Sequence, residues 1–288
     1  MRPDYDVVYP PDEAETAGSH EKLEIQLLLQ AIYQAYGYDF RNYAYDSIRR
    51  RILHAMQVMG ERTISGFIPR ILHDPRQLFL LLDLLIVSVS EMYRDPSMFK
   101  EFREKVIPFL RTYPYIRIWH AGCSRGEEVL SMAILLEEEG VYDKARIYAT
   151  DIDEGALTLA REGQYPLSIM EKFAVNYRLA GGTRDFSEYY TVEHNEARFR
   201  PTLLRNVVYA SHNLVTDHSF NEFNVIMCRN VMIYFDRQLQ NRVHQLFYDS
   251  LAMFGFLSLG SPETVSNFAG SDCYEPINEK EKLYRRIK

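Results

Sequence analysis

The residues best suited to chemistry lie in one stretch, Ile118–Ala133, which reads IWHAGCSRGEEVLSMA. An apolar strand there leads through Gly122 and Gly126 into a helix, so the backbone can approach a ligand closely and offer free N–H groups at the helix start. A pyrophosphate-binding loop would read G-x-G-x-x-G, and the acids Glu127 and Glu128 would repel a diphosphate. Two carboxylates suit a positively charged ligand, such as S-adenosylmethionine with its ammonium and sulfonium groups. The alternative is a plain turn whose acids stabilise the helix start.

Two acids, Asp151 and Asp153, stand directly after a second apolar strand, Arg146–Thr150. An acid at the end of the second strand of a nucleotide-binding sheet commonly accepts hydrogen bonds from ribose hydroxyls. Asp151 is better placed for this role, whereas Asp153 is equally well explained as the N-cap of the next helix. Together with the glycine loop, Asp151 indicates an adenosine-containing ligand at the carboxyl edge of the sheet.

A third segment, Phe223–Asp236, reads FNVIMCRNVMIYFD. Its buried strand would deliver Arg229 and Asn230 to the same edge of the sheet. Tyr234 could point back into the crevice, or it could be a packed ring with its hydroxyl in solvent.

Composition excludes several classes of function. The 8 histidines form no H-x-x-H pair, and 3 scattered cysteines suit neither a zinc site nor a disulfide framework, so we expect no metal and a reduced, cytoplasmic protein. A formal net charge of −7 argues against a nucleic-acid partner. No apolar run is long enough to span a membrane, and the N-terminal segment lacks the apolar core of a signal peptide.

Helical spacing of apolar residues dominates the first part of the chain and then gives way to alternating strands and helices. We expect a flexible lead-in at residues 1–20, a helical domain at 21–111 and an α/β domain at 112–288. Residues 163–205 interrupt the alternation and are predicted to form an inserted subdomain. The fold class is therefore α/β: a doubly wound, Rossmann-like domain with a mostly parallel sheet, preceded by a small all-α domain.

The predicted helices of the first domain are Leu23–Ala35, Tyr45–Met56, Ile64–Leu72, Leu78–Val87 and one that opens at Ser97. The predicted strands are Ile116–Ala121, Arg146–Thr150, Asn206–Ser211, Phe223–Cys228, Phe256–Gly260 and Lys282–Ile287. The predicted helices between them are Gly126–Glu139, Glu154–Glu162 and Arg237–Met253.

Taken together, the three segments resemble the CheR-type chemoreceptor methyltransferases, which are S-adenosylmethionine-dependent protein-glutamate O-methyltransferases. The resemblance covers roughly residues 36–288 and rests on the motifs AGCSRGEE, ATDID, SHNLVTD and CRNVMIYFD, of which the last is highly specific. In the helical part, SVSEMYRDPSMF resembles the family's N-x-T-x-F-F-R-D-P segment. The family's fold has the order of elements predicted above.

The resemblance implies roles for individual residues. It places Arg94 beside the methyl donor and the glutamate to be modified, and it places Tyr234 facing the active site. It implies that the cofactor is S-adenosylmethionine, released as S-adenosylhomocysteine. The implied cofactor-binding residues are Ser88, Ser90, Arg94, Gly122, Glu128, Asp151, Asn213, Leu214, Arg229 and Asn230.

The sequence also departs from the family pattern. Ser88 and Ser90 stand where the family usually has Asn and Thr, and Arg125 replaces a small Thr in the glycine loop. Gly260–Glu263 reads GSPE where G-H-S-E is common. None of these changes removes the arginine, the ribose acid or the tyrosine, so we expect an active enzyme.

A basic cluster predicts where the substrate docks. Residues 41–51 carry four arginines against one aspartate, and Arg49, Arg50 and Arg51 are consecutive. Chemoreceptor methylation regions are helical bundles rich in glutamate, which a basic helix would attract. The alternative is a solvated helix face with local ion pairs. The partner expected is thus the cytoplasmic helical bundle of a chemoreceptor, bound by a monomeric enzyme that needs no receptor tether and does not insert into the membrane.

Two other functions stay open at this point. The chain could be a small-molecule methyltransferase with the same cofactor domain, or a CheR-like module that binds the cofactor without catalysis.

Overall fold

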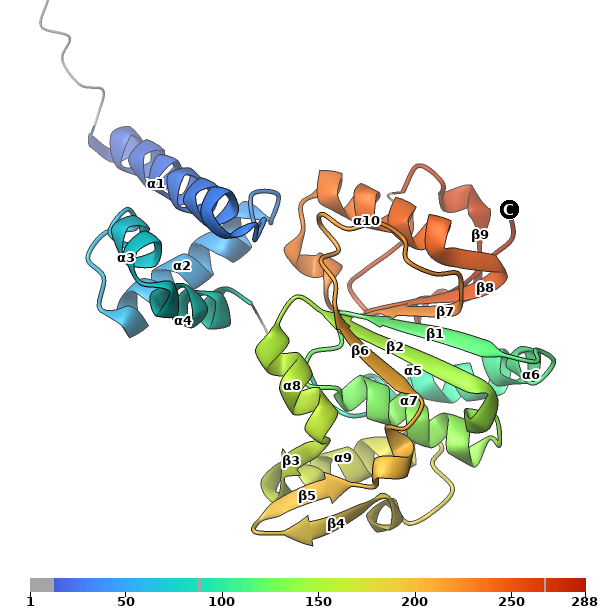
Figure 1. The fold of residues 1–288 in the computed structure, drawn as a ribbon. Helices are drawn as coiled ribbons and strands as arrows, with labels where there is room; N and C mark the ends of the chain where they lie inside the picture. The colour runs from blue at the N-terminus through green and yellow to red at the C-terminus, as the bar shows by residue number, and fades with distance from the viewer. Residues whose placement is uncertain (1–12, 87–89, 267) are drawn as a thin grey trace, which may run out of the picture. The chain divides into compact units, whose positions relative to one another are not determined.

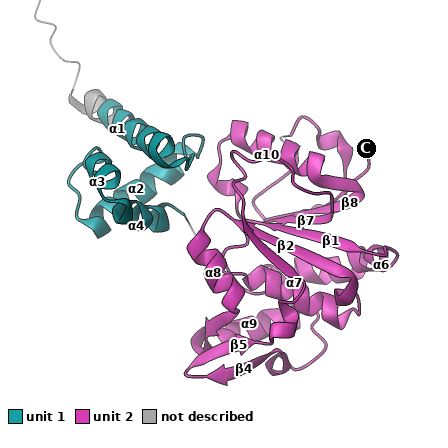
Figure 2. Cartoon of the chain, viewed as in Figure 1, with its two compact units in different colours: residues 1–87 teal, residues 88–288 magenta. Residues whose placement is uncertain are grey.

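The computed structural model describes residues 13–86, 90–266 and 268–288, with the backbone alone for residues 13–18. The chain divides into two compact units, residues 1–87 and residues 88–288 (Figure 2). We call them the helical unit and the α/β unit.

The boundary between the units lies at residue 87, not near residue 112 as the sequence pattern suggests. The helical run that follows this boundary buries Phe99 and Phe102 in the same core as Ile116 of the first strand. Helical periodicity shows that a segment has a buried face but not what covers that face. The sequence prediction for residues 88–111 was therefore wrong about the unit to which they belong.

The helical unit consists, within its described residues, of four helices around one apolar core. They are α1 Glu13–Tyr36, α2 Tyr45–Met59, α3 Phe67–His73 and α4 Pro75–Leu85. Leu28, Ile32, Ile52 and Phe67 are fully buried in that core. Because α1 begins at Glu13, the lead-in predicted for residues 1–20 is too long.

Local signals set the ends of these helices. Gly60 closes α2 in the left-handed conformation, with φ 69°, as expected for a glycine after the last helical turn. Asp74 caps α4 by accepting a backbone N–H, and Pro75 occupies its first turn, so α4 starts earlier than the predicted Leu78. The helix ends before Ile86, whose backbone is extended.

The α/β unit is built on a seven-stranded sheet in the order β6-β2-β1-β7-β8-β10-β9. Its strands are β1 Ile116–Ala121, β2 Ala145–Asp151, β6 Val207–Ser211, β7 Phe223–Cys228, β8 Leu251–Leu259, β9 Tyr274–Asn278 and β10 Leu283–Arg286. The first five strands in this order pair in parallel, and the last two pairings are antiparallel. This mostly parallel, doubly wound sheet confirms the predicted fold class.

Helices cover both faces of this sheet (Figure 1). They are α5 Pro96–Glu101, a π-helical turn Phe102–Val106, α6 Ile107–Leu110, α7 Glu127–Glu138, α8 Glu154–Glu162 and α10 Arg237–Ser250. In Figure 1, α10 lies on one face of the sheet, and α5, α7 and α8 lie on the other. Both faces are thus shielded, as a parallel sheet requires.

Two predictions for the C-terminal part of the sheet were wrong. The helix predicted to reach Met253 ends at Ser250, because Leu251 pairs with Phe223 of β7 and opens β8 instead. The strand β9 was not predicted, because a segment with Pro276 looks like a loop until pairing with β10 holds it at the sheet edge.

The inserted segment forms a second, three-stranded sheet in the order β3-β5-β4. Its elements are β3 Gln164–Pro166, α9 Leu167–Leu179, a turn Phe186–Tyr189, β4 Tyr190–Glu193, β5 Glu196–Phe199 and a turn Pro201–Leu203. The rings of Tyr165, Phe173 and Phe199 pack edge to face in its core. These apolar residues of the insertion belong to the same core as the residues beneath the main sheet.

A buried carboxylate, Glu138 at the end of α7, joins this insertion to the main sheet. Its Oε1 accepts the hydroxyl of Tyr189 at 3.0 Å and the backbone N–H of Thr183 at 3.0 Å. Its Oε2 lies 2.6 Å from Arg103 of the π-helical turn. Burial raises the pKa of the Glu138 carboxyl, but the hydrogen bonds of Tyr177 and Arg103 outweigh burial and leave it below 4.5.

Among the described residues, no helix is long and apolar enough to cross a membrane.

Replacing Glu138 tests this junction. Glu138→Ala should lower the free energy of unfolding by about 3 kcal/mol at neutral pH, because it removes one of the two carboxylates paired with Arg103 and the acceptor shared by Tyr177, Thr183 and Tyr189. Part of the difference should vanish as the pH falls below about 4.5, since a carboxyl with a lowered pKa loses its contribution when it is protonated. Urea unfolding of the full chain measures both effects.

The matched control is Asp143→Asn, which removes an exposed ion pair with Arg205. It should change stability by less than about 0.5 kcal/mol. Equal effects of the two substitutions would contradict the role of Glu138.

Candidate functional site

The predicted site residues that follow strands of the main sheet come together because four parallel strands end at one edge of the sheet. The register pairs Ala121 with Thr150, and Asp151 with Ser211, so β1, β2 and β6 finish side by side. On the other side of β1, β7 ends at Cys228. The loops that follow these strands therefore share one crevice edge, which is where such sheets bind ligands.

The glycine loop after β1 is folded tightly against β2. The N–H groups of Gly122 and Cys123 both donate to the carbonyl of Thr150, at 2.8 and 2.9 Å. Gly122 has φ 79°, and a Cβ there would lie 2.5 Å from Val231 of the loop after β7. The glycine is thus required both by its conformation and by the close approach of the two loops.

Asp151 takes the position predicted for a ribose-binding acid. Its carboxylate accepts the N–H of Ser124 at 2.7 Å and that of Asp153 at 3.0 Å, so it is fixed at the end of β2. Burial raises the pKa of Asp151 despite these hydrogen bonds. Asp153 itself caps α8 by accepting the N–H of Ala156, as expected for an N-cap residue.

Asn213 and Leu214 follow β6 at the same edge. His212, which comes directly before them, donates its backbone N–H to the carbonyl of Asp151 at 3.1 Å. The Asn213 side-chain oxygen accepts the N–H of Val215, so it stabilises a local turn. Leu214 is buried.

The loop after β7 is organised by an acid that the sequence reasoning did not select. Glu263, which is 5% exposed, accepts the N–H groups of Asn230, Val231 and Met232 at 2.8 to 3.0 Å. Burial raises its pKa, although those hydrogen bonds oppose the shift. Its place in the GSPE segment, which resembles the family's G-H-S-E, was the available signal, but only the tertiary fold shows what it binds.

Asn230 itself adopts φ 61°, a left-handed conformation. Its side-chain oxygen is buried and has no hydrogen-bond partner among the described residues. Tyr234 lies half-buried in the short turn Met232–Tyr234 of the same loop.

Arg229 lies at the centre of this edge, with its side chain only 2% exposed. Its guanidinium donates to the carboxylate of Asp95 at 2.8 Å, the carbonyl of Arg94 at 3.0 Å and the carboxylate of Glu128 at 2.9 Å. The two terminal nitrogens of Arg229 thus hold Glu128 and residues 94–95, whereas its buried Nε has no partner among the described residues and stays available, with the backbone, for the predicted contact with the adenosine part.

The segment that carries Arg94 has two further anchors. The backbone N–H of Tyr93 donates to Ser131 of α7 at 2.9 Å, and the carbonyl of Met92 accepts from Asn176 of α9 at 3.0 Å. The Arg94 side chain is half-buried and forms no hydrogen bond or ion pair within the described part of the chain. Its backbone is thus fixed, while its guanidinium is available.

The two acids at the start of α7 have different surroundings. Glu128 accepts from His120 and Arg229, both at 2.9 Å. Burial raises the pKa of Glu128, but the hydrogen bond of His120 and the charge of Arg229 outweigh it, so the pKa is lowered. Glu127 is 4% exposed, its Oε2 has no partner among the described residues, and burial raises its pKa to about 7.

The remaining predicted cofactor contacts come from the segment before Arg94. Ser88 lies outside the described residues. Ser90 is half-buried in an irregular stretch.

The predicted docking arginines do not form one basic face. Arg49 is paired with Glu21, with Nη2 to Oε2 at 3.0 Å. Arg51 is 7% exposed and donates to the carbonyl of Leu85, so the prediction that it lies on an outer docking surface is wrong. Arg50 is exposed, and its side chain forms no hydrogen bond or ion pair within the described residues. Sequence alone could not show which of these arginines is exposed, because that depends on which face of the helix packs against the rest of the unit.

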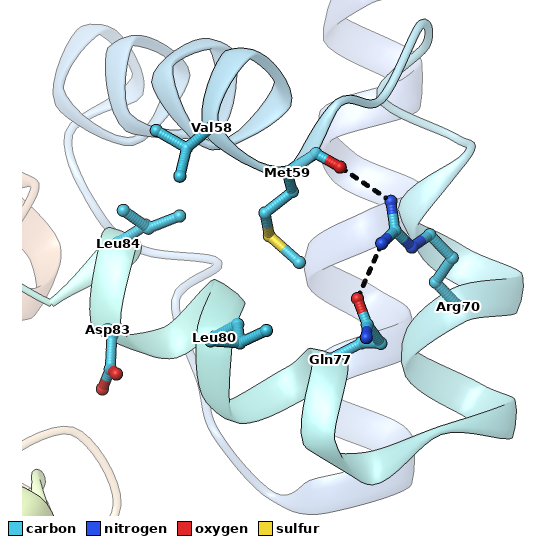
Figure 3. A pocket seen from close by; sticks show the side chains of 7 residues that line it. All are labelled: Val58, Met59, Arg70, Gln77, Leu80, Asp83 and Leu84. Atoms are coloured by element: carbon cyan, nitrogen blue, oxygen red, sulfur yellow. Dashed lines mark hydrogen bonds between the residues drawn. The ribbon is translucent and has the colours of Figure 1, made fainter.

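A hollow of about 480 Å³ lies in the helical unit, between the end of α2 and α4 (Figure 3). Val58, Met59 and Leu80 give it an apolar wall, and Arg70 spans its far side by binding the carbonyl of Met59 and the side chain of Gln77. None of the predicted site residues lines it.

The edge of the main sheet fits S-adenosylmethionine. Gly122 and its neighbours offer backbone that a ligand can approach, and Asp151 is a half-buried acid at the predicted ribose position. The buried Oγ of Ser124 and Oδ1 of Asn230 have no partner among the described residues, and a polar ligand would satisfy such atoms. Within the described residues no group of His, Cys, Asp or Glu side chains could hold a metal ion.

The raised pKa of Glu127 gives a pH-dependent prediction. The folded protein holds a proton on this carboxyl that the unfolded chain releases, so wild-type stability should fall as the pH rises from about 4.5 to about 7. Glu127→Gln should remove this loss and be more stable than wild type by roughly 2 to 4 kcal/mol at pH 8, but not at pH 4. Urea unfolding at several pH values measures the difference.

Glu154→Gln, an exposed acid at the start of α8, is the matched control and should keep the wild-type pH dependence. A difference in the free energy of unfolding between Glu127→Gln and wild type that stays constant across this pH range would contradict the raised pKa of Glu127.

Comparisons with known proteins identify the family of this chain. Residues 88–279 match the family described as CheR methyltransferase, SAM binding domain, and residues 23–86 match CheR methyltransferase, all-alpha domain. A Pseudomonas putida protein named "Putative methyltransferase Cher3" is 48% identical over 94% of this chain and 99% of its own length. Chemotaxis protein methyltransferases of Listeria innocua and Borreliella burgdorferi are 29% and 28% identical, over 80% and 90% of this chain and 86% and 94% of their own lengths. The chain belongs to the CheR family of S-adenosylmethionine-dependent methyltransferases.

Proposed function

We propose that this protein methylates glutamate side chains of a chemoreceptor, with S-adenosylmethionine as the methyl donor. The observation that carries the proposal is that Arg94 has an anchored backbone and an unpaired guanidinium within the described residues. Its backbone is held at the cofactor edge by Arg229, while its half-buried guanidinium forms no ion pair with any described residue. A positioned guanidinium with unused donors suits a substrate carboxylate.

The chemistry asks little of the protein beyond positioning. A glutamate carboxylate has a pKa of about 4.3 and is ionised at neutral pH, so no general base is needed to make it a nucleophile. Bound S-adenosylmethionine supplies a sulfonium methyl group, whose transfer to a carboxylate oxygen breaks the carbon–sulfur bond and yields the methyl ester and S-adenosylhomocysteine. Alignment of the carboxylate and exclusion of water are then the protein's contribution.

The chain's residues divide this work. Asp151 and the backbone around Gly122 bind the nucleoside end of the cofactor, and the unpartnered Asn230 oxygen is a further acceptor for it. Arg94 holds the substrate carboxylate by a charge-assisted hydrogen bond, and Tyr234 orients it. The interaction between Arg94 and the substrate carboxylate must be of moderate strength, because a strongly bound carboxylate would be a weaker nucleophile.

The receptor as substrate is supported by the names of several relatives, which are chemotaxis protein methyltransferases. The docking partner is the acidic helical bundle of the receptor in the cytoplasm, bound by a monomer of this protein. Of the three arginines in the α2 cluster, Arg50 is the one whose charge faces solvent without a described partner, and it attracts the bundle.

A transfer assay with labelled S-adenosylmethionine and receptor-containing membranes tests the function. Wild type should place base-labile label on the receptor, and Arg94→Ala should lower kcat by about 100-fold or more, because the substrate carboxylate loses its charged partner. Cofactor affinity, measured by calorimetry, should stay within about threefold, since the Arg94 side chain binds the substrate more than the cofactor.

The matched control is Arg146→Ala, an exposed arginine at the opposite end of β2, which should turn over like wild type. Wild-type turnover by Arg94→Ala would remove its catalytic role. Label on small acceptors but not on receptor would identify a small-molecule methyltransferase, and cofactor binding without any transfer would identify a non-catalytic module.

Charge reversal tests the docking role of Arg50. Arg50→Glu should raise the KM for receptor about fivefold and leave kcat and cofactor affinity unchanged, because it repels an acidic bundle without reaching the chemistry. Arg76→Glu reverses another exposed charge of the helical unit and serves as the control. An equal rise in KM for both variants would point to net charge rather than to a docking face.

A further inference from the structure

One buried arginine connects the cofactor edge to the segment that carries Arg94. Arg229 follows β7, and its guanidinium binds Glu128 through Nη1 and both the Arg94 carbonyl and the Asp95 carboxylate through Nη2. Its side chain is 2% exposed, and the ring of Phe99 lies 5.6 Å from its guanidinium carbon. A buried cation with two carboxylates and a carbonyl around it has a fixed geometry.

The segment held in this way is strained. Tyr93 has φ 51° and Asp95 has φ 55°, so two non-glycine residues on either side of Arg94 adopt the left-handed conformation. This conformation is unfavourable for residues with a side chain, and it persists only where the surrounding structure holds it. The hydrogen bond to Ser131 restrains Tyr93, and the ion pair with Arg229 restrains Asp95.

We propose that Arg229 and Asp95 are positioning residues for methyl transfer, because their ion pair fixes the backbone from which Arg94 reaches the substrate carboxylate. The same guanidinium also binds Glu128, in the first turn of the helix that follows the glycine loop, and so connects the backbone of Arg94 to that helix. The inference rests on the proposed catalytic role of Arg94 and adds two residues that act through it. The planar guanidinium is essential, since the single ammonium of a lysine cannot bind a carbonyl and two carboxylates in this arrangement.

Asp95→Asn is the most informative substitution. Asparagine tolerates the left-handed conformation, so the change weakens the ion pair without adding backbone strain. We expect kcat with receptor to fall about tenfold, because a misplaced binding group slows alignment. The cofactor affinity should remain within about twofold of that of wild type. The urea concentration at the unfolding midpoint should remain within about 0.3 M of the wild-type value. That split separates positioning from a structural role.

Arg229→Lys tests the other half of the pair and should lower kcat by about 10- to 100-fold. If both residues act through one contact, the double variant Asp95→Asn/Arg229→Lys should be no slower than Arg229→Lys alone. The matched control is Lys172→Gln, which removes a surface ion pair with Glu91 on the same segment. It should leave kcat unchanged.

The outcomes separate this inference from the proposed function. If Arg94→Ala is inactive while Asp95→Asn turns over like wild type, the positioning role is overturned and the catalytic role stands. If Arg94→Ala keeps wild-type activity, both are overturned. Loss of cofactor affinity and stability in Asp95→Asn together with kcat, or fully multiplicative losses in the double variant, would also overturn the positioning role.

Discussion

The parallel alignment of β6, β2, β1 and β7 is the constraint on which the rest of the structure depends. Parallel strands end at one edge, so four loops that are far apart in the chain are brought to one place. The close approach of Gly122 to Val231 shows how tightly two of these loops meet. A sheet of this kind also needs helices on both faces, which α7 and α10 provide (Figure 1).

Charge pairing at that edge links the start of α7, directly after the glycine loop, to the segment of Arg94. The side chain of Arg229 is 2% exposed, so the carboxylates of Glu128 and Asp95, rather than solvent, balance most of its charge. Glu263 does the equivalent work for the backbone N–H groups of the loop after β7. The site is therefore held by buried ionic contacts, while Arg94 keeps its guanidinium unpaired among the described residues.

The insertion is stabilised by the same kind of contact. Glu138 accepts donors from the inserted segment and from Arg103 of the π-helical turn, so three separate stretches of chain meet at one carboxylate. The residues following the helical unit thus belong to the α/β unit through ionic contacts as well as through their apolar faces.

The sequence by itself determined the α/β fold, the strands β1 and β7, the helix α8 and the residues at the carboxyl edge, because alternating periodicity and glycine position are local signals. Only the tertiary structure decided that residues 88–111 join the second unit, that Leu251 opens a strand and that Arg51 is buried. It also separated Glu127 from Glu128, which are adjacent and chemically identical. Burial and ion pairing come from distant parts of the chain, and local patterns carry no record of them.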